Sequence, residues 1–174
     1  SKFNFCFSAS KSSKKLLKKL GVKKVKFIGN LKFSQTEKDF VEKQKNFEDL
    51  VKLKKVWCAS STHYNEEEQC GVVHKKLKKK YKNLFTIIIP RHINRATSIK
   101  DSLEDQGLKV HLHEPKKKID KDTDIYIVNA YGKTKSFYTY CKNVFLGGSI
   151  INHGGQNPLE AARFGCNILH GPNV

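Results

Sequence analysis

The sequence contains no methionine, one tryptophan and only three arginines, Arg91, Arg95 and Arg163, although its net charge is +18. Arginine supplies the planar contacts by which proteins usually read phosphates and bases, so its scarcity argues against a nucleic-acid-binding module. No apolar run is long enough to cross a bilayer, and no signal peptide is visible. The charge comes from scattered lysine runs, which favours solvated helix faces. Attraction to nucleic acid or to an anionic membrane is the alternative.

Cysteine pairs at zinc-binding spacing are also missing. The five cysteines are odd in number and widely spaced, without a CxxC pair. This argues against a zinc site and favours free thiols in a reducing cytoplasm. The chain has no initiator methionine and stops soon after Gly171 without a closing helix, so we expect a fragment that is cut at both ends.

The most distinctive stretch is a glycine-rich segment near the carboxyl end. The apolar run Val144 to Leu146 predicts a buried strand, which leads into the glycine pairs at 147–148 and 154–155. Asn157-Pro158 suits the N-cap and first position of a short helix, and Gly165 suits its end. Such a segment offers free backbone N–H groups and a positive dipole end, so we expect it to bind a phosphate or a carboxylate. A flexible surface turn is the weaker alternative, because a turn needs fewer glycines.

Apolar periodicity divides the chain into alternating strands and helices. Leu84 to Ile89 is uninterrupted, as in a central strand buried on both faces, whereas Val110 to His113 is typical of an edge strand. The other expected strands are 25–28, 56–59, 125–128, 144–146 and 166–169. The expected helices are 14–20 with an apolar face of Leu16, Leu17 and Leu20, then 34–53, then 65–81 with a stripe of Cys70, Val73, Leu77 and Tyr81, then a weaker one ending at Gln106, and 137–141. This order predicts an α/β fold, a Rossmann-like parallel sheet with helices on both faces.

Unusual residues follow four of the predicted strands. They are Ser60 to His63, Pro90-Arg91, Tyr131-Gly132 and Gly147-Gly148. In an open α/β sheet the ligand lies at the carboxyl ends of the strands. We therefore expect these four loops to converge on one cleft.

The side chains of this predicted cleft suit a ligand with one phosphate. Arg91 could hold a phosphate through two parallel hydrogen bonds, and a surface salt bridge is an equal alternative. His63 could orient a ligand, although a structural histidine is more common at such a place. Ser61 and Ser149 are weak signals, and Glu160 could accept hydrogen bonds from a ribose diol or face the helix dipole. Neither a Walker lysine motif nor a GxGxxG fingerprint is present.

The acidic run Glu66 to Glu68 opens the helix that Asn65 can cap. Consecutive residues of a helix point in different directions, so the run does not suit a metal ion. We expect these carboxylates to face the helix dipole, and we expect neither a metal site nor a cofactor.

Five blocks carry a resemblance to a known family. They are Gly-Asn-Leu-Lys-Phe at 29–33, Trp-x-Ala-Ser-Ser-Thr-His-x-x-Glu-Glu-Glu at 57–68, Ile-Ile-Ile-Pro-Arg-His at 87–92, Tyr-Gly at 131–132, and Gly-Gly-Ser…Gly-Gly-Gln-Asn-Pro-Leu-Glu at 147–160. Together and in this order they resemble the 3-deoxy-D-manno-octulosonic acid (Kdo) transferase family of lipopolysaccharide synthesis. The resemblance covers nearly the whole chain.

The resemblance implies one half of a two-domain GT-B glycosyltransferase. Residues 1–33 would be the tail of the amino-terminal acceptor domain with a linker, and residues 34–174 the truncated carboxyl-terminal donor-binding domain. The donor would be CMP-Kdo and the acceptor a lipid A precursor. The enzyme would work at the cytoplasmic face of the bacterial inner membrane and touch the membrane through the missing amino-terminal domain. The family's general base also lies in that domain, so we expect the chain alone to be inactive.

The resemblance also implies residue roles. The residues implied to contact CMP are Pro90, Arg91, Tyr131, Gly132, Lys133, Asn157, Pro158, Leu159 and Glu160. Lys32 is implied to stabilise the transition state, which suits a cation near a departing phosphate. Ser61, His63, Gly148 and Ser149 are further candidates at the donor cleft.

Three residues depart from the family pattern. Lys133 stands where an acidic residue is usual, Asn65 where glycine is common and Gln156 where histidine is common. These departures suggest a divergent member. The rival functions are another GT-B nucleotide-sugar transferase or epimerase, or a basic nucleic-acid-binding module. We expect no nucleic-acid partner.

Overall fold

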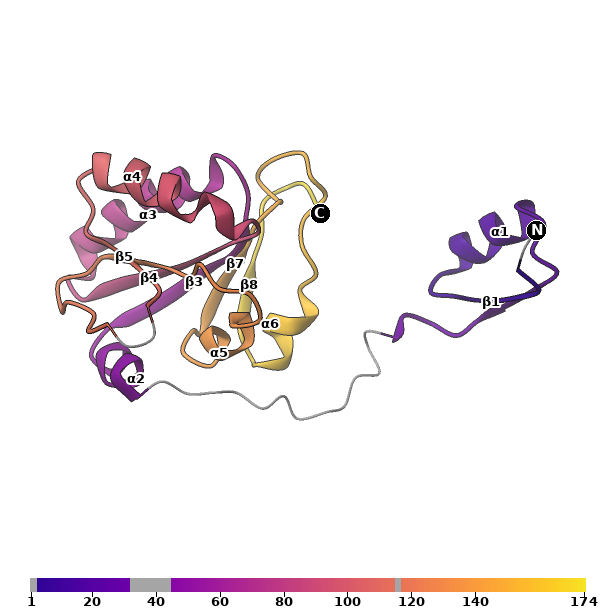
Figure 1. Cartoon of the computed structure of the whole chain (residues 1–174), viewed down its shortest axis with the longest axis horizontal. Helices are drawn as coiled ribbons and strands as arrows, with labels where there is room; N and C mark the ends of the chain where they lie inside the picture. Colours follow the sequence, from indigo (N-terminus) through magenta and orange to yellow (C-terminus); the bar gives the residue numbers. More distant parts are fainter. Residues whose placement is uncertain (1–2, 32–44, 115–116) are drawn as a thin grey trace. The chain divides into compact units, whose positions relative to one another are not determined.

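Two units make up the chain, Ser1–Asp39 and Phe40–Val174. The computed structural model describes residues 3–31, 45–114 and 117–174 (Figure 1). The start of the helix predicted over 34–53 therefore lies outside the described residues. That the first unit is the tail of an acceptor domain stays a prediction.

The first unit is a small βαβ motif. Strands β1 (Phe5–Ser8) and β2 (Lys24–Phe27) pair in parallel and are joined by helix α1 (Lys11–Lys19). The Ser10 side chain caps α1 by accepting the Ser13 N–H at 3.0 Å. The helix is confirmed, but its apolar face is not packed within this unit. Leu16 and Leu20 are 61% and 73% exposed, because two short strands offer little surface to cover.

The second unit is built on a six-stranded parallel sheet. Its strands are β3 (Lys55–Thr62), β4 (Leu84–Pro90), β5 (Val110–Leu112), β6 (Ile125–Ile127), β7 (Asn143–Leu146) and β8 (Asn167–Leu169). Their order across the sheet is β5-β6-β4-β3-β7-β8, and every neighbouring pair runs parallel. The predicted α/β fold is confirmed, and β5 is the edge strand that its sequence suggested.

Helices cover both faces of this sheet (Figure 1). The helices are α2 (Lys45–Lys52), α3 (Glu66–Lys80), η2 (Ile93–Arg95), α4 (Ala96–Asp105), α5 (Thr134–Tyr138) and α6 (Leu159–Arg163). One core gathers around Phe47 of α2, with residues of α5 and α6, and the other around Ile99 of α4. All seven residues of β4 are buried. Ile87 and Ile88 point into opposite cores, which confirms β4 as a central strand.

Helix α3 packs on a different face from the one predicted. Val73 and Leu77, two residues of the expected stripe, are 43% and 36% exposed. The buried residues of α3 are Glu66, Glu67, Cys70, Gly71 and His74. A Cβ on Gly71 would lie 2.7 Å from a methyl carbon of Leu103, so glycine allows α3 to approach α4 closely. The apolar pattern did not predict the buried face of α3, because Glu66, Glu67 and His74 on that face are polar and are buried with hydrogen-bonding partners.

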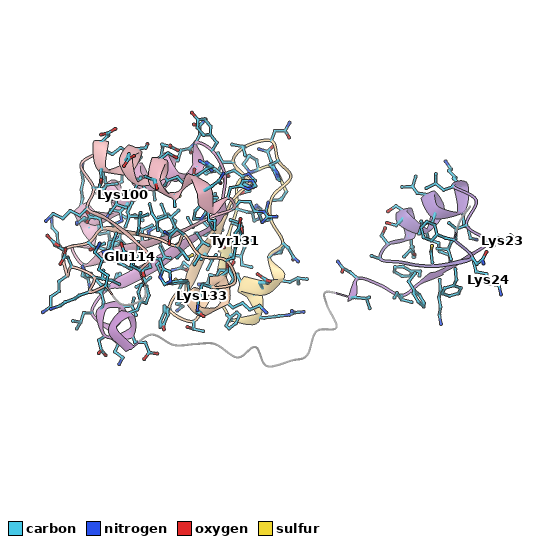
Figure 2. All side chains as sticks on the ribbon, viewed as in Figure 1. Lys23, Lys24, Lys100, Glu114, Tyr131 and Lys133 are labelled. Atoms are coloured by element: carbon cyan, nitrogen blue, oxygen red, sulfur yellow. The ribbon has the colours of Figure 1, made fainter. Side chains whose placement is uncertain are left out.

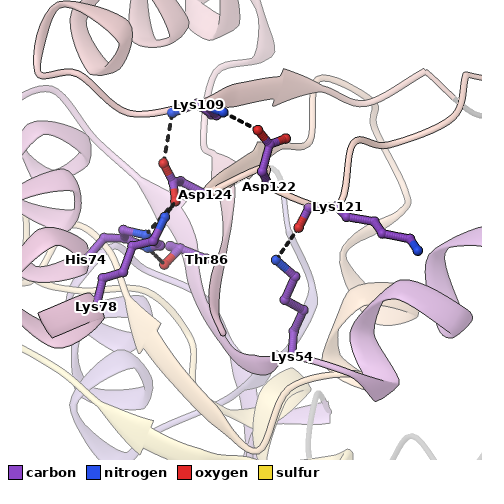
Figure 3. Close-up of polar contacts among 8 residues, drawn as sticks. All are labelled: Lys54, His74, Lys78, Thr86, Lys109, Lys121, Asp122 and Asp124. Carbon is purple, nitrogen blue, oxygen red and sulfur yellow. Dashed lines mark hydrogen bonds and ion pairs between the residues drawn. The ribbon is translucent and has the colours of Figure 1, made fainter. Parts of the chain in front are cut away.

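A buried polar network surrounds Asp124 at the amino-terminal ends of the sheet strands, which we call the amino edge of the sheet, as opposed to the carboxyl edge at the other strand ends (Figure 3). Its carboxylate accepts the Lys109 backbone N–H at 3.0 Å and pairs with the Lys78 ammonium. His74 lies 3.4 Å from the same carboxylate and 2.7 Å from the Thr86 hydroxyl. Burial alone would raise the pKa of Asp124, but the Lys109 N–H and the Lys78 charge leave it lowered. This network joins α3 to β4 and to the segments that directly precede β5 and β6.

Two general features complete the fold. All five cysteines are free, as the sequence suggested, and four of them are buried. Within the described residues, helices stay too short or too polar to traverse a lipid bilayer.

Candidate functional site

The topology places a switch point beside β3. The chain passes from β3 to β4 on one side and later returns to β7 on the other side of β3. Crevices at such points, outside the carboxyl ends of the strands, are the usual ligand sites of open α/β sheets. Ring centroids of His63 and His92 lie 6.0 Å apart, and those of His63 and His153 lie 4.2 Å apart. Three of the four loops predicted to converge, those after β3, β4 and β7, therefore meet here, and the convergence of the loop after β6 stays a prediction.

The end of β3 differs from the expected loop. Ser60, Ser61 and Thr62 belong to the strand, whose register against β4 shifts between Ser60 and Thr62. Ser61 has a φ of 55°, which is uncommon for a residue other than glycine. A Cβ on Gly147 would lie 2.4 Å from the Ser61 carbonyl oxygen, so glycine is needed for this approach. The irregular strand end and the glycine loop fit each other.

Glu66 occupies the donor groups of the glycine-rich loop. Its fully buried carboxylate accepts backbone N–H groups of Gly148 at 2.7 Å, Ser149 at 3.1 Å and Ile150 at 3.1 Å, and of His63 at 2.9 Å. The expectation that these loop N–H groups are free for an external anion was wrong. The sequence pattern found an anion-binding loop correctly, but the anion is an internal side chain supplied by α3.

The neighbouring Glu67 makes a second internal contact. Its buried carboxylate forms two hydrogen bonds with Arg95 of η2, at 3.0 and 3.1 Å. Burial raises the pKa of Glu67, while Arg95 and Thr62 act in the opposite direction. The acidic run therefore anchors two loops instead of facing the dipole in solvent. Asn65 has a φ of 70° and makes no side-chain cap, so that expectation was also wrong.

Ser149 and Gly148 have structural roles in the loop. The buried Ser149 hydroxyl donates to the Leu146 carbonyl at 2.5 Å and accepts the Gly171 N–H at 2.9 Å. These bonds use the hydroxyl hydrogen and one of its lone pairs, and a role of Ser149 in ligand binding stays a prediction. Gly148 has a φ of 69°, and a Cβ there would lie 3.4 Å from atoms of His63 and His153.

Arg91 is the exposed cation of the cleft. Pro90 is the buried last residue of β4, and the Arg91 backbone N–H donates to the Thr62 carbonyl at 2.9 Å. Its guanidinium pairs with no acidic side chain among residues 3–31, 45–114 and 117–174. The surface salt bridge that the sequence left open is thus not formed with the described acids, and the side chain is available to an anion.

The other candidates lie in the loop after β6 and at the start of α6. Tyr131 is 75% exposed, and Tyr131 and Lys133 lie in the segment between β6 and α5 (Figure 2). The intervening Gly132 has a φ of 72°. At the other loop, the Asn157 side chain accepts the Leu159 N–H at 3.0 Å, but the N-cap is Pro158 and α6 begins at Leu159, one residue later than predicted. The Gly165 N–H bonds to the Ala162 carbonyl at 2.9 Å, and its φ of 72° confirms the helix end.

Exposed side chains surround the start of α6. Pro158 and Glu160 are exposed, and Leu159 is half-buried. A hollow of about 220 Å³ adjoins this start, lined by Leu146, Gln156, Pro158, Ile168, His170 and Val174. Larger hollows of about 350 and 320 Å³ lie near the amino-terminal ends of the strands, lined by lysines or by apolar side chains. We place the site at the carboxyl edge because the loops with unusual residues converge there.

The sequence analysis assigned no site role to three residues that lie beside His63. His92 and His153 each lie near His63, and the Gln156 amide nitrogen lies 3.3 Å from His63 Nε2. Burial and the neighbouring His153 lower the pKa of His63, while Glu66 acts in the opposite direction. The available signal was that all three follow predicted strands. Lys32, the implied transition-state residue, lies outside the described residues.

We searched the described residues for side chains that could bind a metal ion together. Among the described residues, no cluster of three or more His, Cys, Asp or Glu side chains could hold a metal ion. The arrangement instead combines one exposed guanidinium, several imidazoles and a capped helix start, which suits an anionic ligand.

The chain is similar to known transferases. It is 34% identical over 161 residues to a 3-deoxy-D-manno-octulosonic acid transferase of Rickettsia bellii, covering 89% of the chain and 37% of that protein. It is 31% identical over 172 residues to the enzyme of the same name from Aquifex aeolicus, and this match covers 98% of the chain and 44% of that protein. The chain thus spans less than half the length of these relatives. No protein-family model matches it.

A solved structure shares the fold. The C-terminal CMP-Kdo binding domain of WaaA from Acinetobacter baumannii superposes with a TM-score of 0.68 at 24% identity. The match covers 75% of this chain and 68% of that domain.

Proposed function

Because the chain belongs to the 3-deoxy-D-manno-octulosonic acid transferase family, we propose that it supplies the donor-binding half of a Kdo glycosyltransferase. The sugar would move from CMP-Kdo to a lipid A precursor. The observation that carries this proposal is the convergence of three loops at the switch point of the sheet, with Arg91, which forms no ion pair with an acid of the described part of the chain. The similar fold of a domain described as binding CMP-Kdo supports the choice of nucleotide.

In this proposal the CMP moiety lies along the carboxyl ends of β4 and β6 and the start of α6. Arg91 binds the phosphate by charge-assisted hydrogen bonds, and Pro90 shapes the wall beside it. Glu160 accepts hydrogen bonds from the ribose diol. Tyr131, Gly132 and Lys133 bound the pocket from the loop after β6, and Asn157 holds the start of α6 in place.

Catalysis would require positive charge near the departing phosphate. Arg91 and Lys32 are the proposed cations, and preorganised charge of this kind typically lowers a barrier by a few kcal/mol, about 3 for one donor. The acceptor is a lipid, so we propose that the whole enzyme works at the cytoplasmic face of the inner membrane. Its membrane contact would lie in the acceptor domain.

Calorimetric titration of the chain with CMP tests the proposal, with UMP and a short RNA as controls. We expect CMP to bind more tightly than UMP and to keep its affinity when salt is raised. Binding of RNA that dominates at low salt and collapses at moderate salt would instead indicate a basic nucleic-acid module. Equal affinity for CMP and UMP would contradict the cytidine assignment and favour another nucleotide-sugar enzyme.

A further inference from the structure

Three imidazoles from three separate loops gather at the switch point. His63 follows β3, His92 follows β4 and His153 lies in the loop after β7. The His63 and His153 rings lie 4.2 Å apart at an interplanar angle of 37°, and His92 approaches His63 edge-on at 6.0 Å. Imidazoles can become cationic near neutral pH, so such a cluster is a concentrated source of inducible positive charge.

The backbone of the glycine-rich loop cannot supply this charge itself. The N–H groups of Gly148, Ser149 and Ile150 already donate to Glu66, as described above. Glu66 is fully buried, so an incoming anion cannot displace it without leaving a carboxylate unpaired. An anion at this point of the cleft must therefore be met by side chains.

Before a ligand binds, the contacts of His63 favour the neutral form of its ring. Gln156 can donate an amide N–H to His63 Nε2, and only an unprotonated ring nitrogen can accept it. Burial and His153 lower the pKa of His63, and His92 and Arg91 act in the same direction. Glu66 is the group that opposes them, and its carboxylate accepts four backbone N–H groups. A new negative charge within a few ångströms would favour the protonated ring.

We propose that His63, His92 and His153 form, beside Arg91, the subsite that receives an anionic oxygen group of the donor, and that the cluster takes up protons when this group binds. The inference rests on the proposed function and deepens it. Two groups share the required chemistry, the phosphate of CMP and the carboxylate of the octulosonic acid. Gln156 would turn its amide oxygen toward the newly protonated ring.

The test measures proton uptake by calorimetry of the full chain at pH 7. Binding enthalpies are compared in PIPES and Tris buffers, whose ionisation enthalpies differ, so that the slope gives the number of protons taken up. The probes are CMP, cytidine, and Kdo added to the CMP-loaded chain. Since the phosphate of CMP also titrates near pH 6, each value is compared with that of the His63→Gln/His153→Gln double variant. His111→Gln, on the edge strand β5, is the matched control.

We expect the wild-type chain and His111→Gln to take up about half a proton to one proton more per ligand than the double variant. The double variant should also bind the same ligand about ten-fold more weakly. If the wild type takes up more protons than the double variant with CMP but not with cytidine, the cluster is assigned to the phosphate. An excess seen only when Kdo joins CMP assigns it to the carboxylate.

The two proposals fail in different ways. CMP and Kdo binding with the same proton count and affinity in wild type and double variant would overturn the histidine subsite while leaving the donor-binding function intact. Absence of CMP binding to wild-type chain that is folded by circular dichroism would count against both. A proton excess that persists with cytidine would overturn the anion assignment.

Discussion

Glu66 and Asp124 are buried carboxylates at opposite edges of one sheet, and they are stabilised in different ways. Glu66, at the carboxyl edge, accepts four backbone N–H groups. Asp124, at the amino edge, accepts one backbone N–H and is faced by Lys78 and His74 (Figure 3). The first arrangement fixes the shape of a loop, whereas the second joins side chains of neighbouring elements.

This difference separates the site from the scaffold. A carboxylate held by loop N–H groups sets where the loop atoms lie, so a change at Glu66 reaches the proposed ligand. A carboxylate held by Lys78, whose side chain is 39% exposed, contributes to stability but is partly screened by water. The following predictions test whether the two edges are independent.

Replacing Glu66 should have the largest effect. In Glu66→Gln the amide NH₂ would face N–H donors, so we expect a loss of about 3 kcal/mol in the free energy of unfolding and a CMP affinity at least about ten-fold weaker. Urea denaturation and calorimetric titration measure the two effects. Glu68→Gln is the matched control on the same helix, because Glu68 accepts one long hydrogen bond from the Ser102 hydroxyl, at 3.3 Å. Equal effects of the two variants would contradict the anchoring role.

Arg91→Ala should weaken CMP binding without a comparable loss of stability. A charged hydrogen bond to the phosphate contributes roughly 1.5–3 kcal/mol, so we expect an affinity loss of about ten-fold or more in the titration. Lys79→Ala, which removes an exposed cation near the amino edge, should leave CMP affinity within about two-fold if position and not net charge decides. Unchanged CMP affinity in Arg91→Ala would remove this residue from the site.

Asp124→Asn should show the opposite profile. The variant keeps an oxygen that can accept the Lys109 N–H but loses its charge, so we expect a loss of about 1–2 kcal/mol in the free energy of unfolding. CMP affinity should stay within about two-fold. Asp122→Asn, which breaks an exposed pair with Lys109, should leave the free energy of unfolding nearly unchanged. A large drop in CMP affinity in Asp124→Asn would show that the edges are coupled.

The smallest effect concerns acid stability. Burial lowers the pKa of His74 in the folded chain, so the unfolded chain binds more protons once the pH falls below about 6.5. Stability is then complete above that pH and declines as the pH falls. Asp124, whose pKa is also lowered, adds a second decline below about 3.9. Urea titrations from pH 8 to 5 should give a shallower decline in His74→Gln than in wild type, and equal slopes would contradict this contribution.

Much of the fold followed from local pattern. The unbroken run at Leu84 to Ile89, the weak strand at Val110 and the stop of α6 at Gly165 are each specified by adjacent residues, and all were confirmed. The packing of α3 was not predictable in this way. Its buried face contains Glu66, Glu67 and His74, whose burial depends on partners far away in the chain.

The sequence by itself determined the parallel α/β architecture and the glycine loop built to receive a carboxylate or phosphate, and it predicted a site at the carboxyl ends of the strands. These follow from strand periodicity and from backbone conformations that neighbouring residues dictate. Only the tertiary structure decided which anion fills that loop, because Glu66 is more than eighty residues away from Gly148 in the chain. The same holds for the meeting of His63, His92 and His153. Contacts between distant segments depend on the strand order, which no local pattern encodes.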